Sequence, residues 1–420
     1  MHDKHTSHRA SKQWDRLPAC QECIDRLEAY PTRQMIDHAR LGTTTKNPGT
    51  EATSMTFYKT LIRPLLFSLD AETAHHLAVE GCRWMGVLPG VTNVARRCLE
   101  SHDPILKTEV TGLRFDNPIG LAAGWDKNGR ALRMLDALGF GLVEIGSVSA
   151  RRSSGNPKPR LFRLPQDSAV VVNYGLPNDG AEIIAERMGS HRGRVPLGVN
   201  IVKTNDGTNA PVCSDEQILS DYEFSTRRLH PHADYLMFNL SCPNAQGGKS
   251  FFAELGNVER LLERLAPLQI QSPVFLKIAP NNDPGHLDRL LTQCKRFDFV
   301  RGFCFNLPSQ RPPLSVAPEH LIDKPGAVAG RPVAAMINDC ISELYRRMDR
   351  DRYIVIGAGG VFTPQDAYDK IRLGASLVQV YTSMIYEGPG VIKRICEGLV
   401  ELLKQDGFNH VSEAVGSAHW

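Results

Sequence analysis

Eight short runs of β-type residues alternate with helix-length segments from about residue 104 onward, and this alternation constrains the fold more than any other feature. We expect strands at Ile119–Ala123, Leu142–Val148, Leu197–Ile201, Tyr235–Leu240, Val274–Ile278, Gly302–Phe305, Tyr353–Ile356 and Leu377–Tyr381. Eight buried strands separated by helices are what an α/β fold of the closed (β/α)8 type, a TIM barrel, requires. An open doubly wound sheet is the competing fold. Polar residues and glycines gather just after the strand ends, where such barrels place their chemistry, so the barrel is favoured.

Composition and charge argue against several classes of function. The 420 residues carry 49 Lys and Arg against 46 Asp and Glu, and the net charge of +3 gives no electrostatic case for nucleic acid as a partner. No apolar run reaches the length of a bilayer span, so we expect membrane contact to be peripheral. The ten cysteines are scattered and no secretory leader is recognisable, which indicates reduced thiols in a cytosol-facing protein. We expect no metal site.

The first segment, residues 1–55, is polar and shows little apolar periodicity, so we expect a weakly ordered extension that breaks at Asn47-Pro48-Gly49. Its eight Lys and Arg are matched by seven Asp and Glu, and this balance disfavours a mitochondrial transit peptide. The pair Cys20-Gln-Glu-Cys23 has no second pair to complete a metal site. We interpret it as two thiols on a helix.

The second segment, residues 56–100, is predicted to hold two amphipathic helices ahead of a barrel at 101–420. The apolar residues recur at helical spacing in two sets on either side of Asp70, namely Phe57, Leu61, Ile62, Leu65, Leu66 and Leu69, and then Ala74, Leu77, Ala78, Cys82 and Met85. Lys59 and Arg63 lie among the first set, a pattern typical of a helix in a membrane interface. The alternative is a helical cap packed on the barrel.

Residues at the ends of several predicted strands indicate an anionic, phosphorylated ligand. Gly357–Gly360 follows the seventh strand and Tyr381-Thr382-Ser383 follows the eighth, so backbone amides and hydroxyls converge where barrels of this kind bind phosphate. Lys127 and Lys277 lie at or beyond strand ends, and a lysine in an apolar run is costly unless an anion pairs with it. Two such lysines suit an electron-rich ring that becomes anionic.

The segment Asn239–Asn244, after the fourth strand, places the thiol of Cys242 between two amide side chains. Asn both donates and accepts hydrogen bonds, which suits a ring with alternating carbonyl and N–H groups. A thiol near a cation can ionise and exchange a proton with a substrate carbon, although a buried structural cysteine is the alternative. Asn200 and Asn306 follow two further strands and are expected to line the same mouth.

These motifs together resemble the dihydroorotate dehydrogenases over roughly residues 56 to 420. The stretches similar to the membrane-associated, quinone-using class are Ile119-Gly-Leu-Ala-Ala-Gly-Trp-Asp-Lys127, Gly155-Asn-Pro-Lys-Pro-Arg-Leu-Phe-Arg163, Gly198-Val-Asn-Ile201, Lys277-Ile-Ala-Pro280, Gly374-Ala-Ser-Leu-Val-Gln-Val-Tyr381, Gly407-Phe408 and Ala414-Val-Gly416. The helical pair, with Phe57-Tyr58, Asp70 and Ala74-His75, resembles that class's two-helix quinone tunnel.

The resemblance implies FMN-dependent oxidation of (S)-dihydroorotate to orotate in pyrimidine biosynthesis, with a quinone as electron acceptor. Cys242 would be the base, and Lys277 would stabilise the negative charge of the reduced flavin. It implies FMN binding by Ala123, Gly124, Lys127, Ser147, Asn200, Asn239, Lys277, Gly330, Gly360, Tyr381 and Thr382. It also implies substrate binding by Lys127, Asn173, Tyr174, Gly175, Asn239, Asn244 and Asn306, and quinone binding by His75 and Arg163. We expect peripheral attachment to the cytoplasmic side of a bacterial inner membrane.

The chain departs from this class at the base position. The quinone-using class usually has Ser where this chain has Cys242, whereas Ser241-Cys242-Pro243-Asn244 resembles the soluble class, whose base is Cys. A thiol, with an ordinary pKa of about 8.5, ionises more easily than a hydroxyl. We therefore predict activity at lower pH than that of a serine enzyme.

Three further departures concern substrate binding. Val172 occupies the place of an orotate-binding Asn, with Asn173 one residue late, while Leu307 and Ala329 replace hydroxyl residues. A carbonyl or carboxylate of the substrate that stays unpaired in the pocket costs about 1 to 3 kcal/mol. Two alternatives therefore stand beside dihydroorotate oxidation: an FMN-dependent paralogue acting on a different ring or enone, and a catalytically silent flavin-binding barrel. The polar residues that the chain keeps at the site argue against a catalytically silent barrel, namely Asn239, Cys242, Asn244, Asn306, Lys127 and Lys277.

Overall fold

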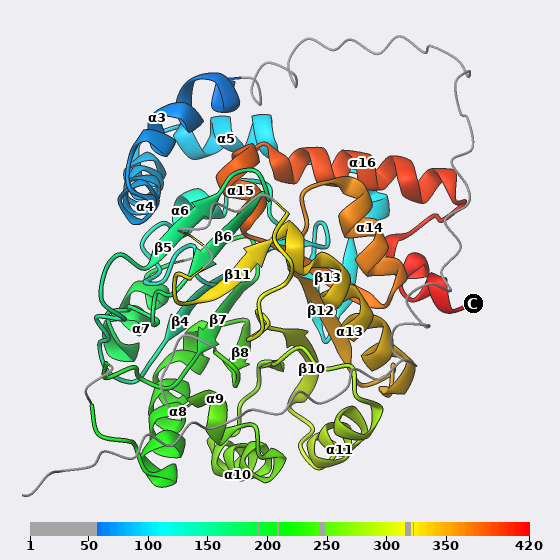
Figure 1. Cartoon of the computed structure of the whole chain (residues 1–420). Helices are drawn as coiled ribbons and strands as arrows, with labels where there is room; N and C mark the ends of the chain where they lie inside the picture. Colours follow the sequence, from blue (N-terminus) through cyan, green and yellow to red (C-terminus); the bar gives the residue numbers. More distant parts are fainter. Residues whose placement is uncertain (1–56, 192, 208–209, 243–247, 316–320, 322) are drawn as a thin grey trace, which may run out of the picture. The chain divides into compact units, whose positions relative to one another are not determined.

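The computed structural model describes residues 57–191, 193–207, 210–242, 248–315, 321 and 323–420. The predicted extension at 1–55, including the Cys20 and Cys23 pair, lies outside these residues. Within them, a closed barrel of parallel strands forms the centre (Figure 1). Going round it, the order is β3 (Ile119–Leu121), β4 (Leu142–Val148), β7 (Leu197–Ile201), β8 (Tyr235–Asn239), β9 (Val274–Ile278), β10 (Val300–Phe305), β12 (Ile354–Ala358) and β13 (Ala375–Val380).

All eight predicted barrel strands are confirmed, with ends that differ from the predicted ones by at most two residues. Closure shows that the barrel interpretation is right and the open doubly wound sheet is wrong. The strands β4, β7, β8 and β9 are buried at every position, because barrel strands meet side chains on the inside and helices on the outside. This burial on both sides explains why these strands appear as largely apolar runs in the sequence.

Helices surround the strands in Figure 1. The longer ones are α7 (Ala181–Gly189), α8 (Asp215–Leu229), α10 (Leu255–Leu265), α11 (Pro284–Cys294), α13 (Ala334–Arg347), α14 (Pro364–Arg372) and α16 (Val391–Gln405), and the short ones are α6 (Leu132–Leu135), α9 (Gly248–Phe251) and α15 (Thr382–Glu387). Local sequence fixes several starts. Ser214 and Thr363 each form a capping box, with Gln217 and Asp366 respectively, at the first turns of α8 and α14.

Two small antiparallel sheets were not predicted. One is the hairpin of β1 (Thr108–Val110) and β2 (Leu113–Phe115). The other joins β5 (Leu161–Leu164), β6 (Ala169–Val172) and β11 (Ala327–Gly330) in the order β11-β6-β5. In this sheet Val172 pairs with Ala327, and Ala329 pairs with Val170. The pairing of β6 with β11 brings together two segments that are far apart in the chain, and both contribute residues to the site described below.

The helical element before the barrel contains the two predicted helices and one more. A π-helical turn, Tyr58–Ile62, leads into α3 (Arg63–Ser68), and α4 (Ala71–Val87) follows. The carboxylate of Asp70 caps α4 by accepting from the backbone N–H groups of Glu72 and Thr73, both at 3.0 Å. The next helix, α5 (Val91–Leu99), was not predicted.

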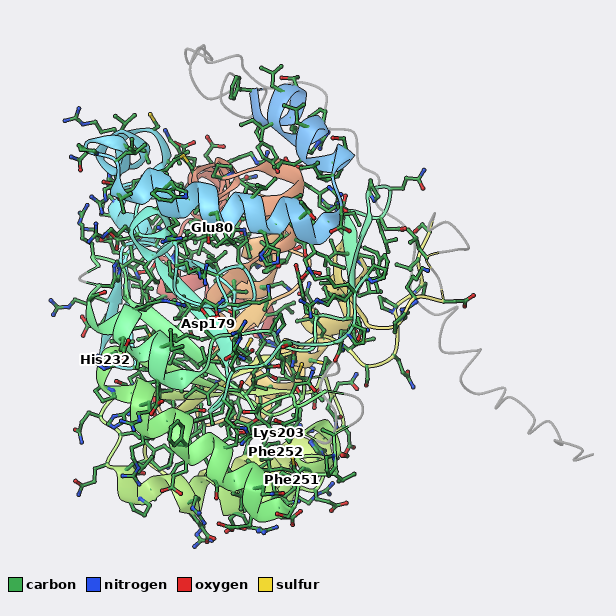
Figure 2. All side chains as sticks on the ribbon, turned by 90° about the vertical axis from the view of Figure 1, so that its left-hand side faces the viewer. Glu80, Asp179, Lys203, His232, Phe251 and Phe252 are labelled. Carbon is green, nitrogen blue, oxygen red and sulfur yellow. The ribbon has the colours of Figure 1, made fainter. Side chains whose placement is uncertain are left out.

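Polar contacts hold this helical element on the barrel. The guanidinium of Arg160, just before β5, donates to the buried carboxylate of Glu72 on α4 at 2.8 Å. Arg130 donates to Glu80 at 3.1 Å and to Asp179 at 3.3 Å, and both acceptor residues are labelled in Figure 2. The element therefore packs as a cap, one of the two alternatives that its sequence left open.

The same element also exposes much apolar surface. Its exposed large apolar side chains are Phe57, Leu61, Ile62, Leu65, Leu69, Leu77, Trp84, Met85, Val87, Leu88 and Val94, whereas few such residues are exposed elsewhere in the described chain. Packing on the barrel and an outward apolar face are therefore both present, and the two interpretations are compatible. No helix among the described residues is long and apolar enough to cross a membrane.

Candidate active site

A cavity lies at the end of the barrel where the strands terminate, and encloses about 1180 Å³ of space, its open mouth included. This end of such barrels carries the active site in known enzymes. Most of the polar and charged side chains that line it come from strands of the barrel or the loops after them: Lys127, Ser147, Asn239, Cys242, Lys277, Asn306, Gln379, Tyr381 and Thr382. Tyr174, which follows β6 of the small sheet, also lines it. The volume suits a cofactor together with a small substrate.

The structure brings most of the sequence-predicted ligand residues to this cavity. The lining includes Ala123, Gly124, Lys127, Ser147, Asn239, Lys277, Gly330, Gly360, Tyr381 and Thr382 from the cofactor set, and Tyr174, Gly175 and Asn306 from the substrate set. Asn200 lies beneath the lining and is fully buried. Asn173 does not line the cavity, and its side-chain oxygen accepts from Asn156 Nδ2 at 3.0 Å. Asn244 lies outside the described residues.

The amide side chains of the mouth form one connected network. Asn306 Nδ2 donates to Asn239 Oδ1 at 2.9 Å, and Asn239 Nδ2 donates to Ser147 Oγ at 3.3 Å. Ser147 Oγ in turn donates to Asn200 Oδ1 at 2.5 Å. Because each amide is held by its neighbours, the cavity presents a fixed set of donors and acceptors to a ligand.

Cys242 is buried and lines the cavity beside this network, one residue after Ser241. The hydroxyl of Ser241 donates to the backbone carbonyl of Lys277 at 3.3 Å and accepts from Asn306 Nδ2, also at 3.3 Å. Neighbouring strands β8 and β9 thus place the thiol, an amide and a lysine at one edge of the cavity. Asn239 and Lys277 are paired in register on these strands.

Two lysines bring positive charge to the cavity. Lys277 is buried in β9, and its ammonium has no hydrogen-bond or ion-pair partner among the described residues. Lys127 Nζ donates to the carbonyl of Gly124 at 2.7 Å and lies 4.0 Å from the centre of the Tyr174 ring. Burial lowers the pKa of Lys127 to about 7, although Glu72 and Asp126 favour its charged form. Both cations are set to receive an anionic group.

Two glycines let the backbone approach the cavity closely. Gly360, after β12, has φ +77, and a Cβ there would lie 2.5 Å from the Cβ of Ala334. Gly330, at the end of β11, has φ +116, and a Cβ there would lie 2.4 Å from the carbonyl oxygen of Ser168. Neither position accepts a side chain without movement. Together with Thr382 at the start of α15, the glycine loop after β12 lines the end of the barrel expected to bind phosphate.

One wall of the cavity is apolar. Val172, Leu307 and Ala329, at which the sequence departs from the quinone-using class, all line the cavity. Val172 and Ala329 belong to one apolar cluster with Tyr174, built by the sheet β11-β6-β5. The backbone N–H of Leu307 donates to Asn306 Oδ1 at 2.9 Å, so part of the acceptor capacity of Asn306 is already used. The polar groups available to a substrate are correspondingly fewer on this side.

The two predicted quinone-binding residues lie in different places. His75, on α4, lines a second cavity of about 950 Å³ between the helical element and the barrel, and Lys127 and Tyr174 line both cavities. Arg163, on β5, instead donates to the carbonyls of Leu66 and Leu69 and lies 4.5 Å from the centre of the Phe67 ring. It lines neither of these two cavities and fastens the end of α3.

Among the polar side chains at or beneath the site, sequence reasoning missed two. Gln379, on β13, lines the cavity, and Glu144, on β4, is fully buried beneath it. The sequence did contain an indication of both, because each is a long polar side chain within a strand whose other residues are apolar or small.

Comparison with known proteins places residues 105–403 in the family model described as Dihydroorotate dehydrogenase. A protein of Acidithiobacillus ferrooxidans named Dihydroorotate dehydrogenase (quinone) is 40% identical over 370 residues, covering 85% of this chain and 98% of its own length. A protein of the same name from Sphingopyxis alaskensis is 38% identical over 363 residues, with 85% and 96% covered.

Solved structures show the same likeness. A ligand-free DHODH of Eimeria tenella superposes with a TM-score of 0.73 at 32% identity, over 84% of this chain and all of the other. The complex of DHODH with ferulenol from the same organism gives a TM-score of 0.68 at 31% identity, over 82% and 95%.

Proposed function

This chain belongs to the quinone-dependent dihydroorotate dehydrogenases, flavoenzymes that oxidise dihydroorotate and pass the electrons to a quinone, and we propose that FMN is its flavin and Cys242 its base. The reaction belongs to pyrimidine biosynthesis. The observation that carries the proposal is the meeting of Cys242, Asn239, Asn306 and Lys277 in one buried cavity at the barrel mouth.

The residues present suit FMN. The ammonium of Lys277 lacks a partner among the described residues and faces the cavity, where the ring of a flavin would meet it. The close-approaching backbone at Gly360 and the first turn of α15 at Thr382 would hold the phosphate. When bound, FMN supplies an acceptor for the hydride of the substrate and a donor of two electrons for the quinone.

The chain's own residues supply the rest of the reaction. Cys242 Sγ takes the proton from one carbon of dihydroorotate, while the hydride leaves the adjacent carbon. Asn239 and Asn306 hold the ring of the substrate through the amide network, and Lys127 offers its charge to the substrate's carboxylate. Burial of Cys242 keeps water away from the thiol. Lys277 favours the anionic form of the reduced cofactor.

The helical element would serve the acceptor and the membrane. Its outward apolar side chains, among them Leu61, Leu65 and Trp84, are 55%, 71% and 61% exposed, which supports peripheral attachment to a lipid surface. His75 places this element against Lys127 and would be the nearest contact of the quinone path to the active site. Arg163 contributes by holding the end of α3 rather than by lining either described cavity. The cytoplasmic side of the inner membrane stays a prediction from sequence.

The test combines cofactor and activity. The purified protein should be yellow, release FMN on denaturation, and reduce a soluble quinone analogue only when dihydroorotate is present. Cys242→Ala should keep the FMN and lose the reaction. A protein that carries no flavin after expression in excess riboflavin would contradict the proposal at its cofactor, and would favour a silent barrel.

A second candidate function rests on the apolar wall. Val172, Leu307 and Ala329 line the cavity, which favours a ring or enone less polar than dihydroorotate as a further substrate of the same flavin site. The measurement is flavin reduction by a panel of cyclic dihydro compounds and reoxidation by cyclic enones. Faster reaction of an apolar compound than of dihydroorotate would establish this function. Saturation by dihydroorotate with ordinary turnover, and none by the panel, would dismiss it.

A further inference from the structure

Glu144 is a fully buried carboxylate that the proposed reaction does not use. It lies on β4 inside the barrel, beneath the cavity, with no exposed surface. Three donors from three other strands converge on it: Asn200 Nδ2 at 2.9 Å, Gln379 Nε2 at 2.8 Å and Tyr235 OH at 3.4 Å. These contacts require each of the three side chains to turn a donor toward the carboxylate, whose oxygens accept.

This requirement fixes the direction of the whole amide network. With its Nδ2 on Glu144, Asn200 must turn Oδ1 to the hydroxyl of Ser147, which then donates to it. The oxygen of Ser147 is left to accept from Asn239 Nδ2, and Asn239 Oδ1 accepts from Asn306. The oxygen and nitrogen ends of an amide side chain have nearly the same shape, so shape alone does not fix their positions. The hydrogen bonds to the Glu144 carboxylate therefore determine which atoms of the network face the cavity.

The same carboxylate also orients Gln379. Its Nε2 donates to Glu144, so Oε1 points away from the carboxylate, and this oxygen is buried without a hydrogen-bond partner among the described residues. Gln379 is 1% exposed and lines the cavity. A buried acceptor with no partner destabilises the ligand-free protein, and a donor on a bound ligand would remove that cost.

We propose that Glu144 is the positioning residue of the flavin site and that Gln379 Oε1 is an additional binding group, which accepts a hydrogen bond from an N–H of the flavin ring. The inference rests on the proposed function in that FMN is the ligand. Glu144 acts through Asn200 and Gln379 and does not itself line the cavity.

The test replaces the carboxylate by an amide of the same shape. In Glu144→Gln the new side chain can donate as well as accept, so Asn200 and Gln379 are no longer held in one orientation. We expect the apoprotein to bind FMN about tenfold more weakly, as the loss of one or two oriented hydrogen bonds implies. We also expect the midpoint potential of the bound flavin to shift by about 30 mV, equivalent to a tenfold change for a two-electron couple, because the groups that face the flavin ring are no longer held in one orientation.

A swapped variant separates orientation from simple damage to the barrel. In Glu144→Gln with Gln379→Glu, the carboxylate at 379 fixes the amide at 144, whose oxygen again accepts from Asn200. We expect FMN affinity to return to within about threefold of wild type, a recovery that loss of packing alone would not give. The matched control is Asp136→Asn, which alters a comparably buried carboxylate outside the cavity, and which should lower the melting temperature without changing FMN affinity.

Each outcome points to one conclusion. Unchanged FMN affinity and midpoint potential in Glu144→Gln, or a swapped variant no better than the single one, would overturn the assignment of Glu144. If Glu144→Gln does not fold, Gln379→Met tests the acceptor directly: about fivefold weaker FMN binding supports it, and unchanged binding overturns it. Wild-type protein that binds no FMN would instead contradict the proposed function.

Discussion

The ammonium nitrogen of Lys127 lies 3.3 Å from Nε2 of His75, and this contact joins the barrel mouth to the helical element. Lys127 lines both the active-site cavity and the second cavity under α4. Burial, and then the charge of Lys127, lower the pKa of His75 well below its usual range. Burial also lowers the pKa of Lys127 to about 7. Without an anion, the pair therefore carries little positive charge at mildly alkaline pH.

Binding of an anion at Lys127 should therefore take up a proton. In the ligand-free protein the pKa of about 7 leaves Lys127 mainly neutral at about pH 8, and a bound carboxylate raises that pKa and restores the charge. Calorimetric titration with orotate in buffers of different ionisation enthalpy should give uptake that approaches one proton at about pH 8 and falls toward zero at about pH 6. Lys127→Met should abolish the uptake. A binding enthalpy that does not depend on the buffer at either pH value would contradict the prediction.

Replacing the base should separate binding from chemistry. Cys242→Ala removes the proton acceptor from the cavity and should slow flavin reduction by dihydroorotate about 10² to 10⁴-fold, with FMN still bound. Cys242→Ser keeps an acceptor that ionises less easily, so its pH–rate curve should shift to higher pH than that of the wild type. The check is the pH dependence of the flavin-reduction rate. Superimposable wild-type and serine curves would show that the thiol is not the base.

A polar group on the apolar wall should improve binding of a polar substrate. Val172→Asn adds an amide beside Ala329 in the lining of the cavity, and a new hydrogen bond of about 1 to 1.5 kcal/mol would lower the KM for dihydroorotate roughly tenfold. Steady-state kinetics measures this. Val170→Asn, in the same strand but buried beneath the wall, is the control expected to destabilise the protein without lowering KM. An unchanged or higher KM in Val172→Asn means that the wall is already fitted to its substrate.

The buried pair of Arg160 and Glu72 should hold the helical element at neutral pH. Burial alone would raise the pKa of Glu72, but the hydrogen bond and charge of Arg160 lower it overall. A lowered folded pKa means that the stabilisation is present above the ordinary pKa of the carboxyl and is lost as pH falls through the lower folded value. Glu72→Gln leaves Arg160 without its counter-charge and should cost about 3 kcal/mol in chemical unfolding. Glu80→Gln, at a more exposed pair, should cost far less.

Charges on the outward face of the helical element should abolish attachment to lipid. Leu61→Glu combined with Leu65→Glu places two carboxylates on side chains that are 55% and 71% exposed, so folding should be unaffected. Sedimentation with vesicles of mixed zwitterionic and anionic lipid should leave this variant in the supernatant, whereas the wild type should pellet. Val212→Glu, at a side chain 84% exposed outside this element, is the matched control and should sediment as wild type does. Equal sedimentation of all three proteins would refute the lipid-facing assignment.

Local patterns explain why much of the fold was predictable. Barrel strands such as β8 and β9 are buried on both faces and therefore appear as largely apolar runs in the sequence. In a parallel barrel the carboxyl ends of the strands meet at one mouth, so Asn239 and Lys277, near the ends of these strands, could be placed there. Asp70 likewise marks the start of α4 through its capping carboxylate.

The remaining features depend on contacts that no local pattern encodes. The pairing of β6 with β11 joins distant segments, so the apolar wall formed by Val172 and Ala329 could not be assembled from the sequence. Glu144 and Gln379 meet only inside the closed barrel, although their polarity within apolar strands was a usable signal. The direction of the Arg163 side chain depends on how the helical element packs. Its contact with the end of α3 could therefore not be predicted from the sequence.

Anaerobic mixing of the purified flavoprotein with L-dihydroorotate, while the visible absorbance of the flavin is followed, tests the proposed reaction at its first step. We predict rapid bleaching in the wild type, slow or no bleaching in Cys242→Ala, and recovery of the colour when a quinone is added. A flavin that stays unbleached with dihydroorotate but is reduced by dithionite would contradict the proposed reaction, and would mean an intact flavin barrel that serves another substrate.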